Sequence, residues 1–207
     1  MKIVHLFHNL MNLYGEYANV LALGRELESS GASVVVEKQS VGDKIDLSDA
    51  DFIYIGSGTE KNQKVALEAL KPFAGEISKA LERGAVVLAT GNSFEIFGKK
   101  ITDKNGREFD GLGFFDFTVT EGDKRVVTDS VCTFNGGEII GFVNKASEIS
   151  GVKNPLFSVK QGAGNSSEDA ANEGIHEGNF YGTHIIGPLL IRNNAAAKYF
   201  AELLLKK

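Results

Sequence analysis

Short apolar runs alternate with helical segments through the first half of the chain, and this alternation constrains the fold more than any other feature. The runs are rich in Val, Ile, Leu, Ala and aromatic residues, so both faces of each strand are expected to be buried. Such strands, separated by helices, are typical of a parallel sheet wrapped by helices. The expected strands are residues 2–8, 32–38, 51–55 and 85–90. The expected helices are residues 15–30 and 60–83, with Pro72 breaking the second.

The second half of the sequence has a different texture, in which Gly, Asn and Asp punctuate short apolar runs. Residues 114–119, 125–134 and 138–143 are expected to form antiparallel strands appended to the parallel sheet. The polar, glycine-rich residues 161–178 are expected to be a surface loop, and residues 194–204 an amphipathic helix. The predicted fold class is therefore α/β, a mostly parallel sheet flanked by helices with appended antiparallel strands.

Composition narrows the classes of function. A chain of 207 residues has the size of one ordinary domain, so residues 1–207 are expected to form a single unit. Its formal net charge is −5 and no cluster of Lys and Arg stands out, which disfavours nucleic-acid binding. The lone Cys132 excludes an intramolecular disulfide and is expected to be a small buried residue in a reducing, cytoplasmic protein.

The same sequence contains no apolar stretch long enough to cross a bilayer, and its first residues do not resemble a signal peptide, so we expect no membrane insertion. No group of His, Asp and Glu has the spacing of a metal site, and no cofactor is expected. His5 and His8, on the first expected strand, are most simply structural.

One strand-to-helix corner carries most of the functional information. The run that ends at Thr90 turns into a helix at Gly91, which is the arrangement of a nucleophile elbow. A plain structural turn is the competing interpretation, because every such junction in this kind of fold has a corner. The turn 56–58 follows another expected strand, and its glycines let backbone N–H groups approach a ligand closely.

Motifs along the chain resemble those of glutaminases of the cobyric acid synthase type, a class I glutamine amidotransferase family, and most closely the glutaminase subunits that act in lipid II amidation. The motifs occur in the same order over roughly residues 9 to 194. They are Asn12-Leu13-Tyr14-Gly15-Glu16 with Asn19, Ile55-Gly56-Ser57-Gly58 with Gln63, Phe97-Gly98-Lys99-Lys100, Gly111-Leu112-Gly113, Glu173-Gly174-Ile175-His176, and Gly182-Thr183-His184-Ile185-Ile186-Gly187-Pro188-Leu189-Leu190. The resemblance implies a flavodoxin-like three-layer fold.

Both members of the family's catalytic dyad are missing at the matching positions. The family corner reads Cys-Gly-Gly-Tyr-Gln, in which the cysteine forms a thioester with glutamine, but here it begins with Gly91. The family's late motif reads Gly-Thr-Tyr-Leu-His-Gly-Pro, and its histidine is replaced by Ile186. Glycine cannot attack a carbonyl and isoleucine cannot transfer a proton, so the thioester route is closed. Glycine also adopts the strained angles of an elbow without the usual cost.

Three other residues are weaker catalytic candidates. Ser93 lies two positions past the corner, but it has no evident base and also suits helix capping. His184 is two residues before Ile186, so in an extended segment it would point to the same side. Glu16 matches an acidic residue that, by the resemblance, supports the dyad; otherwise it caps the first helix.

The backbone of the site is expected to survive the loss of the dyad. Gly58 and Asn92 are placed to present N–H groups toward a common point, which suits a small amide or carboxylate. We therefore expect a ligand-sized cleft with Glu16 near its rim. Its predicted lining is Gly56, Ser57, Gly58, Gly91, Asn92, Ser93 and Ile186.

Three hypotheses follow from the sequence. The first is a noncatalytic glutaminase-like subunit that docks on an ATP-dependent ligase, which the resemblance implies to be Mur ligase-like, in peptidoglycan synthesis, or corrinoid-amidating, in cobalamin biosynthesis. The second is an amidase or amidotransferase of altered chemistry that uses Ser93, His184 or Glu16. The third is a sensor that binds an amide or an amino acid without turnover.

Overall fold

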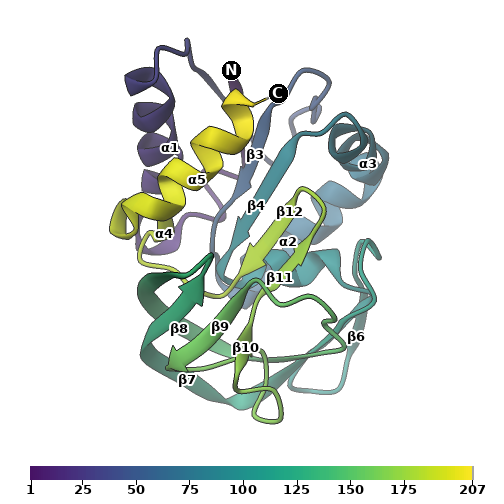
Figure 1. Ribbon diagram of the computed structural model, residues 1–207. Helices are drawn as coiled ribbons and strands as arrows, with labels where there is room; N and C mark the ends of the chain where they lie inside the picture. Colours follow the sequence, from purple (N-terminus) through teal and green to yellow (C-terminus); the bar gives the residue numbers. More distant parts are fainter. Residues whose placement is uncertain (207) are drawn as a thin grey trace.

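The computed structural model describes residues 1–206. Its first sheet has the strand order β11-β12-β4-β3-β1-β2, in which all neighbours are parallel except the edge pair β11 and β12 (Figure 1). This arrangement confirms the predicted, mostly parallel sheet. The strands are β1 (Lys2–Leu6), β2 (Val35–Gln39), β3 (Phe52–Ile55), β4 (Val86–Thr90), β11 (Ile175–Glu177) and β12 (Phe180–Thr183).

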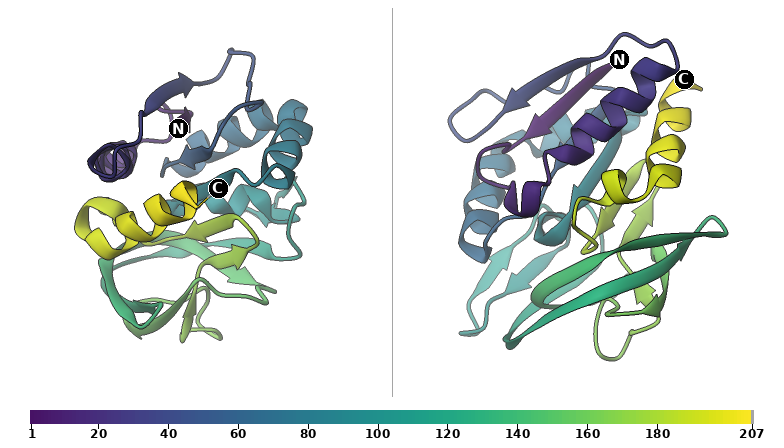
Figure 2. Two further views of the ribbon diagram at one scale, coloured as in Figure 1. Left: turned by 45° about the horizontal axis from the view of Figure 1, so that its top comes forward. Right: turned by 90° about the vertical axis from the view of Figure 1, so that its left-hand side faces the viewer.

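Helices cover both faces of this sheet (Figures 1 and 2). Successive residues of a strand point to opposite faces, and β3 shows the division. Phe52 and Tyr54 share a core with α1 and α5, whereas Ile53 and Ile55 share a core with α2 and α3. The predicted three layers are therefore present. The α-helices are α1 (Ala18–Ser29), α2 (Glu60–Leu70), α3 (Ala74–Glu82), α4 (Leu189–Arg192) and α5 (Asn194–Leu205), and the 3₁₀ helices are η1 (Leu13–Gly15), η2 (Lys71–Phe73) and η3 (Gly91–Phe97).

Two helices differ from a simple uninterrupted run over their expected residues, each for a local reason. The long one breaks at η2, where Pro72 stands, as the sequence predicts. The first begins later than expected, because Tyr14 and Gly15 have positive φ angles of 61° and 74° that end the short helix η1 before α1 starts.

Most strands of the second half form a second, largely antiparallel sheet, which confirms the predicted antiparallel strands appended to the parallel sheet. Its order is β10-β9-β7-β5-β6, with β8 paired to β7, and it lies beyond the carboxyl ends of the parallel strands (Figure 1). The longest strands of this sheet are β7 and β8, which form a hairpin. Its turn residues Asn135 and Gly136 have the positive φ angles of a two-residue hairpin loop. The strands are β5 (Lys100–Thr102), β6 (Glu108–Asp110), β7 (Thr118–Phe134), β8 (Gly137–Ser150), β9 (Phe157–Gln161) and β10 (Asn172–Glu173).

The expectation of a surface loop over residues 161–178 is wrong for part of that range. The segment contributes β10 and β11, and the side chains of Asn165 and Glu173 are fully buried. Polar residues are tolerated there because they are hydrogen-bonded: the Asn165 side chain accepts from the N–H of Gly174 and donates to its carbonyl.

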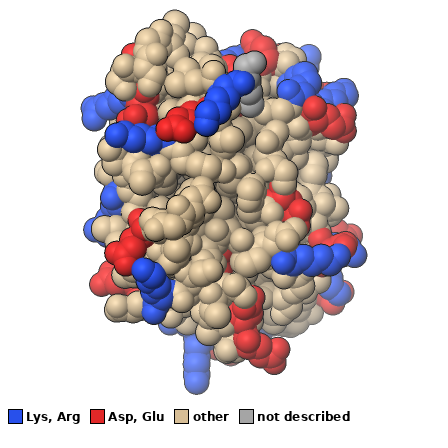
Figure 3. Space-filling model, in the orientation of Figure 1, with Lys and Arg blue, Asp and Glu red and all other residues tan. Residues whose placement is uncertain are grey.

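On the face seen in Figure 3, acidic and basic side chains are interspersed around a largely uncharged middle, and no basic tract crosses it. Within residues 1–206, no helix combines the length and apolar character that crossing a bilayer requires.

Candidate functional site

The corner lies where β4 meets η3. Strand β4 ends at Thr90, and Gly91 follows with a φ of +64°, a left-handed angle that favours glycine. The turn after the neighbouring strand β3 comes against this corner. An ideal Cβ atom built on Gly91 would overlap with the Oγ and Cβ atoms of Ser57 and would lie 3.2 Å from its Cα atom. The volume that a side chain at the corner needs is therefore filled by Ser57.

Glu16 lies beneath the corner and is fully buried, which corrects its expected place at a rim or as a cap of the first helix. One carboxylate oxygen accepts hydrogen bonds from the Thr90 hydroxyl and from the Tyr54 hydroxyl at 3.0 Å. The other accepts from the backbone N–H of Gly187 at 3.2 Å. Glu16 thus bridges the residue before Gly91 and the residue after Ile186, so the two positions of the missing dyad flank one carboxylate.

Burial dominates the electrostatics of this carboxylate. Desolvation raises the pKa of Glu16, and the hydrogen bonds from Thr90, Gly187 and Tyr54 offset only part of that effect. Burial likewise raises the pKa of the Tyr54 phenol well above its ordinary value, and the nearby Glu16 carboxylate adds to the rise. Both groups therefore favour their protonated, uncharged forms more than exposed groups of the same type.

Ile186 is buried and held by the second sheet. Its N–H donates to the carbonyl of Phe142 at 3.0 Å, and its carbonyl accepts from the N–H of Phe142 at 3.1 Å. The hairpin strand β8 thereby covers the position at which the resembling family carries its histidine.

The N–H of Gly58 does not face an open site. It donates to the side-chain Oδ1 of Asn92 at 3.0 Å, so the carboxamide of this chain already takes the donor that the sequence suggested for a ligand. The backbone carbonyl of Asn92 accepts from Nε2 of the buried Gln63 at 2.7 Å. Asn92 is therefore tied both to the turn after β3 and to helix α2.

Sequence reasoning missed a buried polar cluster behind the corner, centred on Glu95. This carboxylate accepts from the Ser147 hydroxyl, from Gln63 and from Nε2 of His184 at 2.8 Å. The available signal was a single charged residue inside the apolar run Phe94-Glu95-Ile96-Phe97, because a charge in a buried segment requires partners.

His184 belongs to this buried cluster. Its side chain is 2% exposed, and its ring lies 4.6 Å from the Phe94 ring between centroids. Its backbone N–H donates to Glu173 at 2.6 Å, and its Nδ1 lies 3.6 Å from the same carboxylate with no hydrogen-bond partner among the described residues.

Ser93 is also fully buried. Its hydroxyl lies 2.8 Å from the carbonyl of Thr90 and 3.0 Å from that of Ile55, and it donates to these backbone acceptors. A hydroxyl directed into backbone carbonyls cannot meet a substrate carbonyl, so this geometry favours a structural role.

A cavity of about 180 Å³ adjoins the corner, between the β3–α2 turn and the hairpin. Of the predicted lining, Ser57, Gly58 and Asn92 border it, together with Glu95 and Ser147 of the buried cluster. The other predicted lining residues are buried and lie outside its wall, as does Glu16; they are Gly56, Gly91, Ser93 and Ile186.

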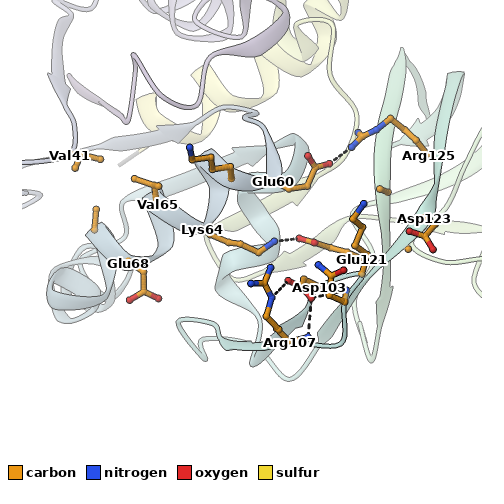
Figure 4. Close-up of a pocket in the computed structure, with 16 residues that line it drawn as sticks. Val41, Glu60, Lys64, Val65, Glu68, Asp103, Arg107, Glu121, Asp123 and Arg125 are labelled. Carbon is orange, nitrogen blue, oxygen red and sulfur yellow. Dashed lines mark hydrogen bonds and ion pairs between the residues drawn. The ribbon is translucent and has the colours of Figure 1, made fainter.

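A larger cavity of about 980 Å³ lies beside α2, β7 and the β5–β6 turn (Figure 4). Oppositely charged side chains in its wall pair with each other, including Lys64 with Glu121 at 2.6 Å and Arg107 with Asp103 at 2.8 Å. It is larger than the cavity at the corner, but none of the predicted site residues lines it.

The remaining candidates lie away from the corner. Cys132 is fully buried in the second sheet, and burial raises the pKa of its thiol to about 12. Over the described part of the chain, no three His, Cys, Asp or Glu side chains are grouped in a way that could hold a metal ion.

Residues 2–194 match the family model described as the CobB/CobQ-like glutamine amidotransferase domain. Two relatives are named lipid II isoglutaminyl synthase (glutamine-hydrolyzing) subunit GatD. The Staphylococcus aureus protein is 30% identical over 98% of this chain and 83% of its own length, and the Streptococcus pneumoniae protein is 31% identical over 100% and 81%. A chain of PurLQS from Thermotoga maritima shares the fold, with a TM-score of 0.64 at 14% identity over 99% of this chain and 97% of that one.

Proposed function

Because the chain belongs to the CobB/CobQ-like glutamine amidotransferase family, we propose that it is a glutaminase-like subunit that does not hydrolyse glutamine. The observation that carries this proposal is the environment of Glu16. This carboxylate bonds to Thr90 and to Gly187, next to the two positions where the chemistry requires a thiol and an imidazole. Those positions are Gly91 and Ile186, which supply neither group.

The positions of Ser93, His184 and Glu16 do not favour them as replacements for the lost groups. The hydroxyl of Ser93 donates to backbone carbonyls, and His184 is bonded to the buried Glu95 behind η3. Glu16 is fully buried under the corner and lies outside the wall of the adjoining cavity. These placements support the noncatalytic interpretation over an amidase or amidotransferase of altered chemistry.

The retained fold suits a role in an assembly. The two relatives are named as subunits of lipid II isoglutaminyl synthase, and the chain spans more than four fifths of their lengths. We therefore propose that this subunit docks on an ATP-dependent ligase, of the Mur ligase-like or corrinoid-amidating kind, in the cytoplasm. Its contribution to the ligase would be structural. The hydrogen bonds of Glu16 preserve the shape of the corner, although the dyad that performs the chemistry is absent.

The first test measures ammonia. Purified chain incubated with glutamine is expected to release no more ammonia than a heat-inactivated sample, both alone and with the partner that co-purifies from the native host. Release above that control by the unmodified chain would overturn the proposal.

The second test concerns the partner. The tagged chain isolated from its native host is expected to carry a stoichiometric second protein that hydrolyses ATP. Recovery of the free chain alone would contradict the docking role while leaving the absence of glutaminase activity standing.

A further inference from the structure

We propose that two side chains of this protein occupy the corner: Ser57 fills the space beside Gly91, and Asn92 takes the N–H that an amide ligand would bind. The site would then exclude amide ligands in addition to lacking the dyad. This inference deepens the proposed function and rests on it for the statement that no thioester forms at Gly91. Its starting point is a pair of contacts. Ser57 fills the volume beside Gly91, and the carboxamide oxygen of Asn92 accepts the N–H of Gly58 at 3.0 Å.

The contact of Asn92 reproduces the interaction that an amide ligand would make. A backbone N–H beside a nucleophile corner is suited to bind the carbonyl oxygen of an amide. The side chain of asparagine ends in the same carboxamide group as glutamine, and here its oxygen already accepts from Gly58. A ligand carbonyl can bind this N–H only after the Asn92 side chain has left.

The internal carboxamide has an advantage over any free ligand. It is covalently tethered at the start of η3, so forming its hydrogen bond costs no translational freedom, whereas a free ligand must lose that freedom on binding. Asn92 is also fixed from its backbone side, because Gln63 donates to its carbonyl at 2.7 Å. The competition therefore favours the closed arrangement.

Ser57 blocks the place of the missing side chain at position 91, whereas Asn92 alone occupies the N–H donor for an amide oxygen. A side chain at position 91 would overlap with both Oγ and Cβ of Ser57. Rotation about the Cα–Cβ bond of Ser57 moves only the hydroxyl and leaves the Cβ atom in place. The closure is consequently built into the residue type, and restoring Cys at position 91 without changing Ser57 would not recreate a free thiol site.

Amide exchange of Gly58, followed by NMR, tests the contact without any ligand. The Gly58 N–H is expected to be protected in the wild type and to exchange roughly ten-fold faster in Asn92→Gly, which removes the acceptor. The matched control is Asn105→Gly, in the exposed β5–β6 turn, which is expected to leave the exchange unchanged. Equal Gly58 exchange in the wild type and Asn92→Gly would overturn the proposal.

Glutamine binding, measured by calorimetry, tests the closure itself. We expect no binding heat with the wild type or with Asn92→Asp, which keeps an acceptor oxygen at the same place, and measurable binding with Asn92→Gly. Asn92→Ala also removes the carboxamide and serves the same purpose if the glycine variant does not fold.

Two results of the binding experiment would overturn the inference: binding of glutamine by the wild type as tightly as by the Gly or Ala variant, or binding by neither variant. Ammonia release by the wild type would instead contradict the proposed function. The two failures are therefore distinguishable.

Discussion

At the scale of single residues, the effects of substitutions at Gly91 and Ser57 on stability are expected to depend on each other. The side chain of Ser57 fills the volume that a side chain at position 91 would need. Gly91→Ala is expected to lower the free energy of unfolding by roughly 2–4 kcal/mol, since it adds left-handed strain and an overlap with Ser57. In Gly91→Ala/Ser57→Gly the overlap is relieved, so the double variant is expected to be more stable than the sum of the single variants implies. Urea unfolding of the three variants measures this coupling.

Gly75→Ala is the matched control for that experiment. Gly75 lies in α3, has no atom within 4 Å of an added Cβ, and does not have a positive φ. Its replacement is expected to be neutral or to stabilise by about 0.4–1 kcal/mol. Additive effects of Gly91→Ala and Ser57→Gly would contradict the coupling.

The sequence predicts the corner but not what fills it. Gly91 at the end of a buried strand is a local signal, and Ile186 is recognisable from the motif around it. The contacts of Ser57 and Asn92 depend on how β3 and β4 are placed side by side, which is a consequence of sheet register and not of local pattern. For the same reason Glu16 was expected at a rim, although the structure buries it.

At the scale of elements, η3 joins the two sheets through Glu95. The carboxylate takes donors from α2, from β8 and from the segment after β12, supplied by Gln63, Ser147 and His184. All three donors are buried, so losing the Glu95 carboxylate removes the acceptor of the Ser147 hydroxyl and of His184 Nε2, whereas Gln63 keeps the Asn92 carbonyl. The cluster therefore fastens the hairpin to the parallel sheet.

Glu95→Ala is expected to lower the free energy of unfolding by roughly 3 kcal/mol or more, because buried groups left without a partner cost about 1–3 kcal/mol each. Glu60→Ala provides the control, since Glu60 is partly exposed and pairs with the exposed Arg125. Surface pairs contribute about 0–1 kcal/mol, so its effect is expected to be small. Equal losses in the two variants, measured by urea unfolding, would show that Glu95 does not fasten the sheets.

The elements differ in how far the sequence predicts them. The parallel strands and their helices follow from apolar periodicity, and Pro72 marks a real break. The separate second sheet does not follow in this way, because β7 pairs with β5, β8 and β9, and two of these pairings join residues far apart in the chain. Buried polar residues such as Glu173 also made a partly buried segment look like a surface loop.

At the scale of the whole molecule, we expect the buried His5 to lower the free energy of unfolding in acid. This histidine lies on β1, between β3 and β2, with 2% of its surface exposed, and its Nε2 has no hydrogen-bond partner among residues 1–206. Burial, together with the nearby charges of His8 and Lys38, lowers the pKa of His5 to about 4. The folded protein therefore keeps this ring neutral at a pH where the unfolded chain binds a proton.

The sign of the effect follows from proton binding. Between about pH 6.5 and pH 4 the unfolded chain takes up a proton on His5 that the folded protein does not, so the free energy of unfolding falls as the pH is lowered. The loss approaches roughly 3 kcal/mol near pH 4 and is absent above about pH 7. The raised pKa of Glu16 acts in the opposite direction, because its folded carboxyl retains a proton more readily than the unfolded one.

The contribution of His5 is separable from that of Glu16 by substitution. His5→Leu is expected to change stability by a constant amount above pH 7 and to become progressively more stable relative to the wild type as the pH falls to 4. Urea unfolding of both proteins across this range measures the difference, from which the titrating groups that do not interact with His5 cancel. Parallel stability curves would show that His5 is protonated equally in the folded and unfolded chains. The buried ring would then not reduce the stability of the protein in acid.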